Sequence, residues 1–298
     1  MPSLYLSRLS SEKRKELENK LWESQGHNCF ICEKKIDLEL HRTEIDIDHV
    51  EPIKVGGKDD PINFAITHSS CNRSKQAADL RVARVLARFG DIRERCALQN
   101  RGSNLSDVLG RYGGAKYETA IRADGDTAEY SFPEIGDNNI YKAPIYKDEL
   151  SGMEFFFAQF PIEYLFHDDR INPRAIGSNI SKLVDEFFKK RPQLHVSLGW
   201  AQLDSNGNKT KIKVFDGQHK AAAQVLLGVK LLPIRVFVKP DLDVLLTTNT
   251  NAGTSLRQVA FDKSIQRHLG SALYVDRVDR YQVDHNLTSD SLDFSEKD

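Results

Sequence analysis

The 298 residues are enough for two ordinary domains, and 40% hydrophobic with 29% charged residues indicates a globular chain rather than a disordered one. The formal net charge of -1 excludes a uniformly basic nucleic-acid binder, so any basic residues that contact nucleic acid would be clustered locally. No stretch approaches the roughly 20 apolar residues of a membrane helix, and the N-terminus has no apolar segment of signal-peptide length. With only four cysteines, a cytoplasmic location without membrane contact is the default expectation.

The N-terminal third is predicted to contain two helices around a polar segment. Residues 11–25 have the spacing of a short amphipathic helix that Ser10 or Ser11 can cap. Residues 28–75 are rich in turn-forming residues, with short apolar runs such as residues 44–50. A segment this small cannot build a large core alone, and such segments are often held together by a metal. Residues 76–99 have the pattern of a second helix, with Gly90 as a candidate kink.

The helix predicted over residues 76–99 has an apolar face that includes Phe89 and Cys96, and an arginine-rich face beside it. Between positions 72 and 101 there are eight Lys/Arg and three Asp/Glu, a local excess that suits a phosphate backbone. The alternative is an ordinary solvated helix face. The residues predicted to contact nucleic acid are Arg73, Lys75, Arg81, Arg84 and Arg88.

The rest of the chain is predicted to form a linker, a second domain and a tail. Residues 101–130 are rich in Gly, Asn, Ser and Asp, which predicts a linker between a first domain at 1–100 and a second at 131–275. Strands are predicted at residues 140–146, 153–160, 194–203, 211–215 and 232–238, with a hairpin turn at 205–208. Helices are predicted at residues 176–190, 221–227 and 255–269, and residues 276–298 form an acidic tail. The alternation predicts a mixed α/β domain.

Two pairs of metal-ligand residues frame the polar segment. Cys29-x-x-Cys32 and His68-x-x-Cys71 are separated by 35 residues. A two-residue spacing lets both side chains of a pair reach one tetrahedral site, and three thiolates with one imidazole are an ordinary structural zinc set. The alternative for His68 is a histidine of the core. The pattern predicts a closed zinc site that performs no chemistry itself.

A second set of polar residues lies between and just after these pairs: Asp48-His49-Val50, Pro52, Gly56-Gly57, Asn63 and Asn72. An imidazole can accept a proton from water near neutral pH, and a hard divalent cation prefers oxygen ligands. Taken one by one, Asp48-His49 could be a strand-end salt bridge, and the two asparagines could cap turns or helices.

The whole pattern, ending in His68-x-x-Cys71-Asn72-x-x-Lys75, resembles the HNH endonucleases, whose fold is two short strands and a helix around one catalytic metal. The resemblance covers about 48 residues. It implies that His49 is the general base that activates water and that Asp48 and Asn72 hold a catalytic Mg²⁺ or Mn²⁺. It also implies that Asn63 braces the loop that orients His49.

A further polar cluster, Asp216-Gly217-Gln218-His219-Lys220, follows a predicted strand and begins a predicted helix. Gly217 permits a tight turn, and the N–H groups of a helix N-terminus favour an anion, so a phosphate or nucleotide site is predicted here. The cluster resembles the DGQHR branch of the ParB/sulfiredoxin-like fold, with Lys220 where that branch has arginine. Residues 171–174 also resemble that superfamily and add Arg174 to the predicted site. The alternative is that Asp216 and Gln218 only cap the turn.

The predicted fold class is α+β: an N-terminal ββα-metal HNH module with structural zinc, linked to a C-terminal mixed α/β ParB/sulfiredoxin-like domain. The predicted function is a metal-dependent DNA endonuclease with a DNA- or nucleotide-sensing domain, a pairing typical of restriction or phage defence. DNA is the expected partner, while a nucleoside triphosphate and a second copy of the chain are left open. The alternatives are a non-catalytic zinc-finger regulator and a nucleotide hydrolase centred on residues 216–220.

Overall fold

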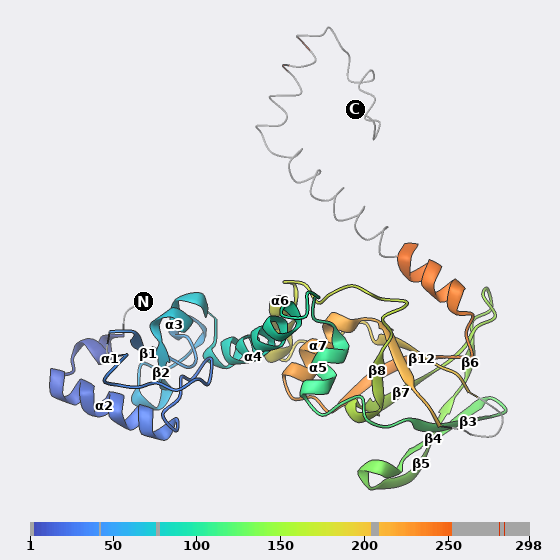
Figure 1. The fold of residues 1–298 in the computed structure, drawn as a ribbon, viewed down its shortest axis with the longest axis horizontal. Helices are drawn as coiled ribbons and strands as arrows, with labels where there is room; N and C mark the ends of the chain where they lie inside the picture. The colour runs from blue at the N-terminus through green and yellow to red at the C-terminus, as the bar shows by residue number, and fades with distance from the viewer. Residues whose placement is uncertain are drawn as a thin grey trace. The chain divides into compact units, whose positions relative to one another are not determined.

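The computed structural model describes residues 3–41, 43–75, 78–203, 209–251, 280 and 283 (Figure 1). Met1–Pro240 form one compact unit and Asp241–Asp298 a second, in which residues 242–251 are helical. Among the described residues, no helix has both the length and the apolarity needed to cross a membrane. The predicted hairpin turn at 205–208 and the predicted helix at 255–269 lie outside the described residues. The same holds for the acidic tail, apart from residues 280 and 283.

The N-terminal region has a β-hairpin flanked by helices. Two helices come first, α1 (Leu4–Ser7) and α2 (Ser11–Ser24), and the Ser10 hydroxyl caps α2 by accepting the Lys13 N–H. The helix predicted at 11–25 is therefore confirmed. Strands β1 (Ile45–His49) and β2 (Phe64–His68) pair antiparallel, with 3-10 turns η1 (Ile53–Val55) and η2 (Pro61–Asn63) between them and α3 (Ser69–Lys75) directly after β2. A small core stabilises the region: Leu21, Cys29, Ile31, Ile36, Phe64, Ala65, Ile66, Leu80 and Ala83.

Helix α4 (Leu80–Ala97) belongs to two cores. Asp79 caps its N-terminus, and the helix continues through Gly90. Its first turn contributes Leu80 and Ala83 to the small N-terminal core. The face predicted to be apolar contributes four buried residues to a second, larger core: Val82, Phe89, Ile92 and Cys96.

Residues 101–130 are not the linker that the composition predicted. They form α5 (Leu105–Arg111), β3 (Thr119–Asp124) and β4 (Thr127–Phe132). The polar residues have local structural roles, since Asn104 and Asp107 make a capping box on α5 and Gly125 takes a left-handed conformation (φ 55°) between β3 and β4. The apolar residues between them are buried in the larger core: Leu105, Val108, Leu109, Ile121, Ala128, Tyr130 and Phe132.

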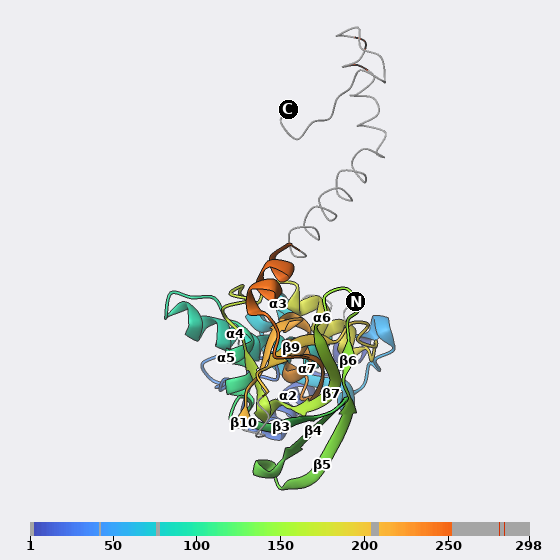
Figure 2. The same cartoon turned by 90° about the vertical axis from the view of Figure 1, so that its right-hand side faces the viewer.

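Two sheets complete the unit. One has four strands in the order β10-β3-β4-β5, adding β5 (Asp137–Pro144) and β10 (Lys209–Thr210), and β3, β4 and β5 lie side by side in Figure 2. The other has six strands in the order β6-β7-β12-β9-β11-β8. Its strands are β6 (Tyr146–Lys147), β7 (Glu154–Pro161), β8 (Leu165–His167), β9 (Ser197–Ala201), β11 (Ile212–Asp216) and β12 (Leu231–Val238).

Helices α6 (Ile180–Phe188) and α7 (Gln218–Leu226) join α5 in the larger core, together with one face of the six-stranded sheet. The short 3-10 turns η3 (Pro133–Ile135) and η4 (Ile162–Tyr164) precede β5 and β8. The predicted mixed α/β character is confirmed, and β9 pairs antiparallel with β11 as the predicted hairpin requires. Strands β3, β4, β8 and β10 were not predicted.

Candidate active site and metal centre

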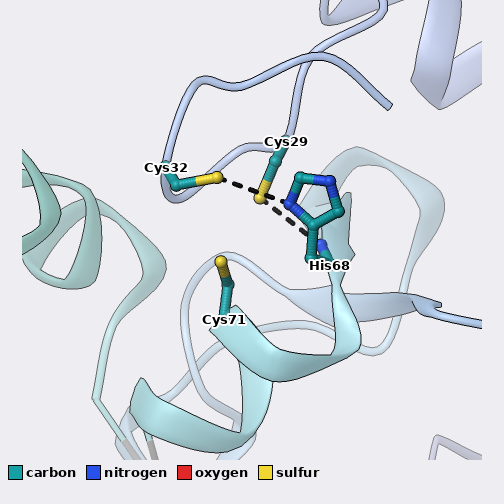
Figure 3. A group of neighbouring side chains, drawn as sticks. All are labelled: Cys29, Cys32, His68 and Cys71. Carbon is teal, nitrogen blue, oxygen red and sulfur yellow. Dashed lines mark hydrogen bonds between the residues drawn. The ribbon is translucent and has the colours of Figure 1, made fainter. Parts of the chain in front are cut away.

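The four predicted zinc ligands come together in the structure (Figure 3). Cys29 and Cys32 lie in the loop after α2, His68 ends β2, and Cys71 lies in α3. Their donor atoms all lie within 4.8 Å of one another, and the Cys32 Sγ is 3.4 Å from the His68 Nδ1. The His68 backbone N–H also donates to the Cys29 Sγ at 3.4 Å. The group has the composition and proximity of a tetrahedral zinc site.

The protonation chemistry of the thiols fits a bound cation. Burial raises the pKa of the Cys32 thiol, and burial followed by the charges of Cys29 and Cys32 raises the pKa of Cys71 to about 12. Three neighbouring thiolates in a half-buried site are unfavourable unless a positive charge compensates them, which Zn²⁺ would do. Three sulfurs and one imidazole fill a tetrahedron, so such a site would be structural rather than catalytic.

The loop that contains Cys29 and Cys32 is held in place by arginines of α4. The Arg84 guanidinium lies 3.8 Å from the Phe30 ring centroid and donates to the Phe30 carbonyl. Arg88 makes a two-pronged pair with the Glu33 carboxylate, at 3.0 and 2.6 Å, and this pair holds the pKa of Glu33 below its ordinary value. Two of the arginines predicted to contact DNA are therefore engaged by the protein's own loop.

The remaining predicted DNA contacts also have partners within the chain. Arg81 pairs with Asp79 at 2.7 Å and lies 5.0 Å from the Phe188 ring centroid. The Arg73 Nε donates to the Ser69 carbonyl one turn earlier in α3, at 3.2 Å. Each of the four predicted arginines therefore has a local partner within the chain: Arg73, Arg81, Arg84 and Arg88.

His49 lies at the end of β1 with its imidazole buried against the edge of the Phe64 ring. Its Nε2 is 2.9 Å from the Asp59 Oδ1, and its Nδ1 is 3.7 Å from the Asp48 Oδ1. Asp59 was not among the predicted site residues. The Asp59 carboxylate accepts a hydrogen bond from the Ser3 hydroxyl, which has the largest effect, and is also stabilised by the Tyr5 N–H and His49. Together these contacts lower the pKa of Asp59 to about 2. Asp59 is therefore ionised at neutral pH and able to orient the imidazole.

The loop that follows His49 is braced by Asn63. The Asn63 Oδ1 accepts the Glu51 N–H at 2.9 Å, and its Nδ2 donates to the carbonyls of Glu51 and Lys58 at 2.9 and 2.8 Å. Gly57 is needed beside it, because a Cβ there would lie 1.9 Å from the Glu51 carbonyl oxygen. This is the bracing geometry that the HNH resemblance implies for Asn63.

Strand β1 and helix α3 contact each other through two polar pairs. The Asn72 Nδ2 donates to the Asp46 Oδ2 at 3.0 Å, and the Lys75 ammonium lies 2.8 Å from the Asp48 Oδ2. Asp46 and Asp48 are two residues apart on β1 and so point to the same face of the strand. The predicted metal ligands Asp48 and Asn72 thus each have another partner, and Asp46 is a further carboxylate beside them that was not predicted.

These residues fit a divalent cation in their chemistry, since two carboxylates and an amide provide hard oxygen donors on one side of the hairpin. The Lys75 side chain is only 6% exposed and compensates the Asp48 charge at this position. Lys75 was predicted to contact phosphate, whereas the structure places its ammonium on Asp48.

The second predicted cluster holds a loop against α7. The Gln218 Nε2 donates to the Arg174 carbonyl at 2.8 Å and to the Asn172 Oδ1 at 3.3 Å, while the Asn172 amide donates to the Phe215 carbonyl at 2.9 Å. The His219 Nε2 accepts the Gly177 N–H at 2.9 Å. Gln218 and His219 therefore bind backbone and side chains of residues 172–177.

Gly217 and His219 are adapted to this packed junction. Gly217 is left-handed (φ 77°), and a Cβ would lie 2.8 Å from the Ser197 hydroxyl, so only glycine fits. Burial, with a smaller effect of the Arg174 charge, lowers the pKa of His219, which keeps the imidazole neutral as an acceptor. The side chains of Asp216, Lys220 and Arg174 make no hydrogen bond or ion pair with the described part of the chain.

Comparison with known protein families identifies the N-terminal site. Residues 29–78 match the family model described as HNH endonuclease. This range contains the three cysteines and the histidine of the zinc-like group, together with His49 and Asn63. The chain therefore contains an HNH endonuclease domain, a type of domain that acts on DNA. No curated protein and no solved structure gives a match, so the ParB/sulfiredoxin-like resemblance of residues 135–270 remains a prediction.

Proposed function

We propose that the chain is a metal-dependent DNA endonuclease that hydrolyses phosphodiester bonds at its HNH domain. The arrangement of the buried His49 imidazole supports this most directly. The Asp59 carboxylate accepts a hydrogen bond from the His49 Nε2–H. This leaves Nδ1, the ring nitrogen nearer Asp48, to accept the proton of an attacking water. A zinc-finger regulator that only binds DNA does not need an imidazole held in this way.

In this proposal Asp48 and Asn72 hold the catalytic ion. A bound Mg²⁺ or Mn²⁺ would stabilise the charge that develops on the scissile phosphate. The Asp46 carboxylate accepts the Asn72 amide N–H, which fixes the amide so that its carbonyl oxygen faces away from Asp46. Asn63 holds the loop after His49, and the zinc site holds the hairpin and α3 together.

Replacing His49 tests the proposal directly. The His49→Ala chain should lose plasmid nicking with Mg²⁺ or Mn²⁺ on the order of 10²–10⁴-fold, the usual contribution of a general base. His195→Ala is a matched control, because His195 is exposed and lies outside residues 29–78. Undiminished cleavage by His49→Ala would contradict the proposal, whereas loss of cleavage in both variants would point to damaged protein.

We infer a sensing role for residues 131–275, in which a phosphate group of DNA or of a nucleoside triphosphate binds at the N-terminus of α7. Arg174 and Lys220 supply positive charge there, at the N-terminal end of a helix, which favours an anion. A role in restriction or phage defence rests on the pairing of the two domains. Phosphate release from each nucleotide, measured with and without DNA, tests this part. Release without any nicking would favour the nucleotide hydrolase instead.

A further inference from the structure

The six-stranded sheet has two chemically different faces. One face joins the larger core through residues such as Phe156, Val214 and Val236. On the opposite face the strand register aligns one residue from every strand. Because directly paired residues on neighbouring strands point to the same face, these six side chains form a continuous line across the sheet. We call this line the aromatic row: Tyr146, Phe155, Phe237, Trp200, Lys213 and Phe166.

Cations lie over the rings of the aromatic row. The Arg235 guanidinium is 3.7 Å from the Phe155 ring centroid and 4.8 Å from that of Phe237. The Lys213 ammonium lies 4.9 Å from the Trp200 ring. At the β8 end of the row, Lys211 lies 5.2 Å from the Phe166 ring. The outer face of the sheet is therefore both aromatic and positively charged.

Two of these cations make no ion pair with the described residues. Within the described ranges, neither Arg235 nor Lys213 has a carboxylate at ion-pair distance, whereas Lys211 lies 3.8 Å from Glu118. The Arg235 Nε is buried without a hydrogen-bond partner among the same residues. Because the Arg235 Nε itself is buried, the two terminal nitrogens of the guanidinium, which make no hydrogen bond with these residues, are the donors that can reach a phosphate oxygen.

The edge of the row also exposes ring surface. Tyr146 and Phe157 are each 49% exposed, and their ring centroids are 6.2 Å apart. Phe157 pairs with Arg235 in the register and so lies on the same face. Duplex DNA keeps its bases stacked inside the helix, so only a single strand can place bases on these rings while its phosphates reach the cations.

We propose that this outer face binds single-stranded DNA, with phosphates at Arg235 and Lys213 and bases stacked on Tyr146 and Phe157. The face would hold a displaced or unpaired strand of the DNA on which the HNH domain acts. The choice of DNA rests on the proposed nuclease function, but the binding does not depend on cleavage.

The test is equilibrium binding by the full chain with His49→Ala in the background, so that the probe is not cut. The probe is a fluorescein-labelled oligothymidine of about 12 nucleotides, a length within the usual site size of single-strand binders. Its binding is measured by fluorescence anisotropy, and a duplex of equal length is measured in the same way for comparison. Tyr146→Ala and Phe157→Ala should each weaken binding of the single strand about tenfold and leave duplex binding unchanged. Arg235→Gln should weaken it and reduce the slope of log K against log salt by about 0.7.

Two exposed residues away from the row provide controls. Leu194→Ala removes an apolar side chain that is 83% exposed, and Lys182→Gln removes an exposed charge on α6. Both should bind the oligothymidine as the parent does. Thermal unfolding reports whether each variant is folded. If Arg235→Gln lowers the midpoint of thermal unfolding, Lys213→Gln is used in its place as the variant that removes a cation from the row.

Unchanged oligothymidine affinity in folded Tyr146→Ala and Phe157→Ala chains would overturn the proposal. Equal losses for single strand and duplex would overturn it too, as would tighter binding of an oligouridine probe. Because the assay is carried out without cleavage, failure of the nuclease proposal would appear in the nicking assay and not in these binding curves.

Discussion

Asp46 orients the amide of Asn72, the side chain proposed to hold the catalytic ion. An asparagine amide can rotate so that either its oxygen or its nitrogen faces a metal site. Only the orientation with the oxygen toward the site allows the metal to bind. In this chain the Asn72 nitrogen is committed to the Asp46 Oδ2 at 3.0 Å. The Asp46 carboxylate therefore selects which end of the Asn72 amide remains available for the proposed ion.

Replacing Asp46 by alanine should weaken Mn²⁺ binding by about 10–100-fold, because the Asn72 amide would lose its orienting acceptor. Asp46→Asn keeps an acceptor oxygen at the same position and should retain more of the affinity. Titration of Mn²⁺ by calorimetry or by electron paramagnetic resonance measures this independently of cleavage. Equal Mn²⁺ affinity in the alanine variant and the parent would show that Asp46 has no such role.

His219 links the stability of the second cluster to pH. Its pKa is lowered by burial, so the unfolded chain binds a proton more readily than the folded one. The contribution of His219 to stability is fully present above its unfolded pKa of about 6.5. It is lost progressively as pH falls from there toward the lowered folded value. Denaturant unfolding at several pH values should show this loss in the parent, and His219→Gln, which cannot titrate, should show a flatter profile below about pH 6.5. Parallel profiles for the two chains would refute this.

The sequence predicted those site residues whose roles depend on local spacing. The two ligand pairs and the turn closed by Asn63 are of this kind. Asp59 and Asp46 could not be selected, because their partners lie elsewhere: Asp59 joins the N-terminal Ser3 to His49, and Asp46 meets an amide 26 residues away. An acidic residue in a polar turn or on a strand has no sequence signal that distinguishes it from a solvated one.

At the scale of secondary-structure elements, α3 connects the Cys3His group with the site proposed for the catalytic ion. Cys71 and Asn72 are neighbours on this helix, and His68 is the last residue of the strand before it. A helix of seven residues is too short to be stable alone in water, so its position depends on what fixes its ends. Loss of zinc should therefore displace Asn72 as well as opening the structural site.

The matched pair of variants for this prediction is Cys71→Ala and Cys96→Ala. The first should lower the zinc content from about one ion per chain to near zero, measured by elemental analysis, and should also abolish nicking in excess Mg²⁺. Cys96 is a buried thiol of the larger core outside the ligand group, so its alanine variant should keep its zinc. Full zinc content in Cys71→Ala, or nicking that survives removal of the zinc, would argue against the coupling.

Elements with strong apolar periodicity were predictable, and those whose burial depends on distant partners were not. Helix α2 follows its predicted range closely, whereas α4 begins at Leu80, after the N-cap Asp79, and not at the predicted residue 76. Residues 101–130 were assigned to a linker, because their glycines, asparagines and serines resemble a loop until the capping box and the β3–β4 pairing are seen. Strand β8 has only three residues and is defined by its parallel pairing with β11, some 47 positions later.

At the scale of the whole Met1–Pro240 unit, α4 makes the two cores interdependent. A boundary at residue 100 looks natural in the sequence, since the helix ends at Ala97 and polar residues follow. The structure instead buries Val82, Phe89 and Ile92 among side chains that come after residue 100. Periodicity predicts that this face is apolar, but it cannot say which part of the chain covers it.

A fragment of residues 1–100 should therefore self-associate, because it exposes the second apolar face of α4 without its covering partners. Sedimentation of the fragment at increasing concentration measures this, and Phe89→Lys with Ile92→Lys in the same fragment should return it to a monomer.

In the intact chain Phe89 is 3% exposed, so Phe89→Ala should lower the free energy of unfolding by about 3–5 kcal/mol in denaturant titrations. The exposed Leu98, at the end of the same helix, provides the control, and Leu98→Ala should change the stability by less than about 0.5 kcal/mol. A monomeric parent fragment, together with an intact Phe89→Ala chain as stable as the parent, would show that the two cores are independent.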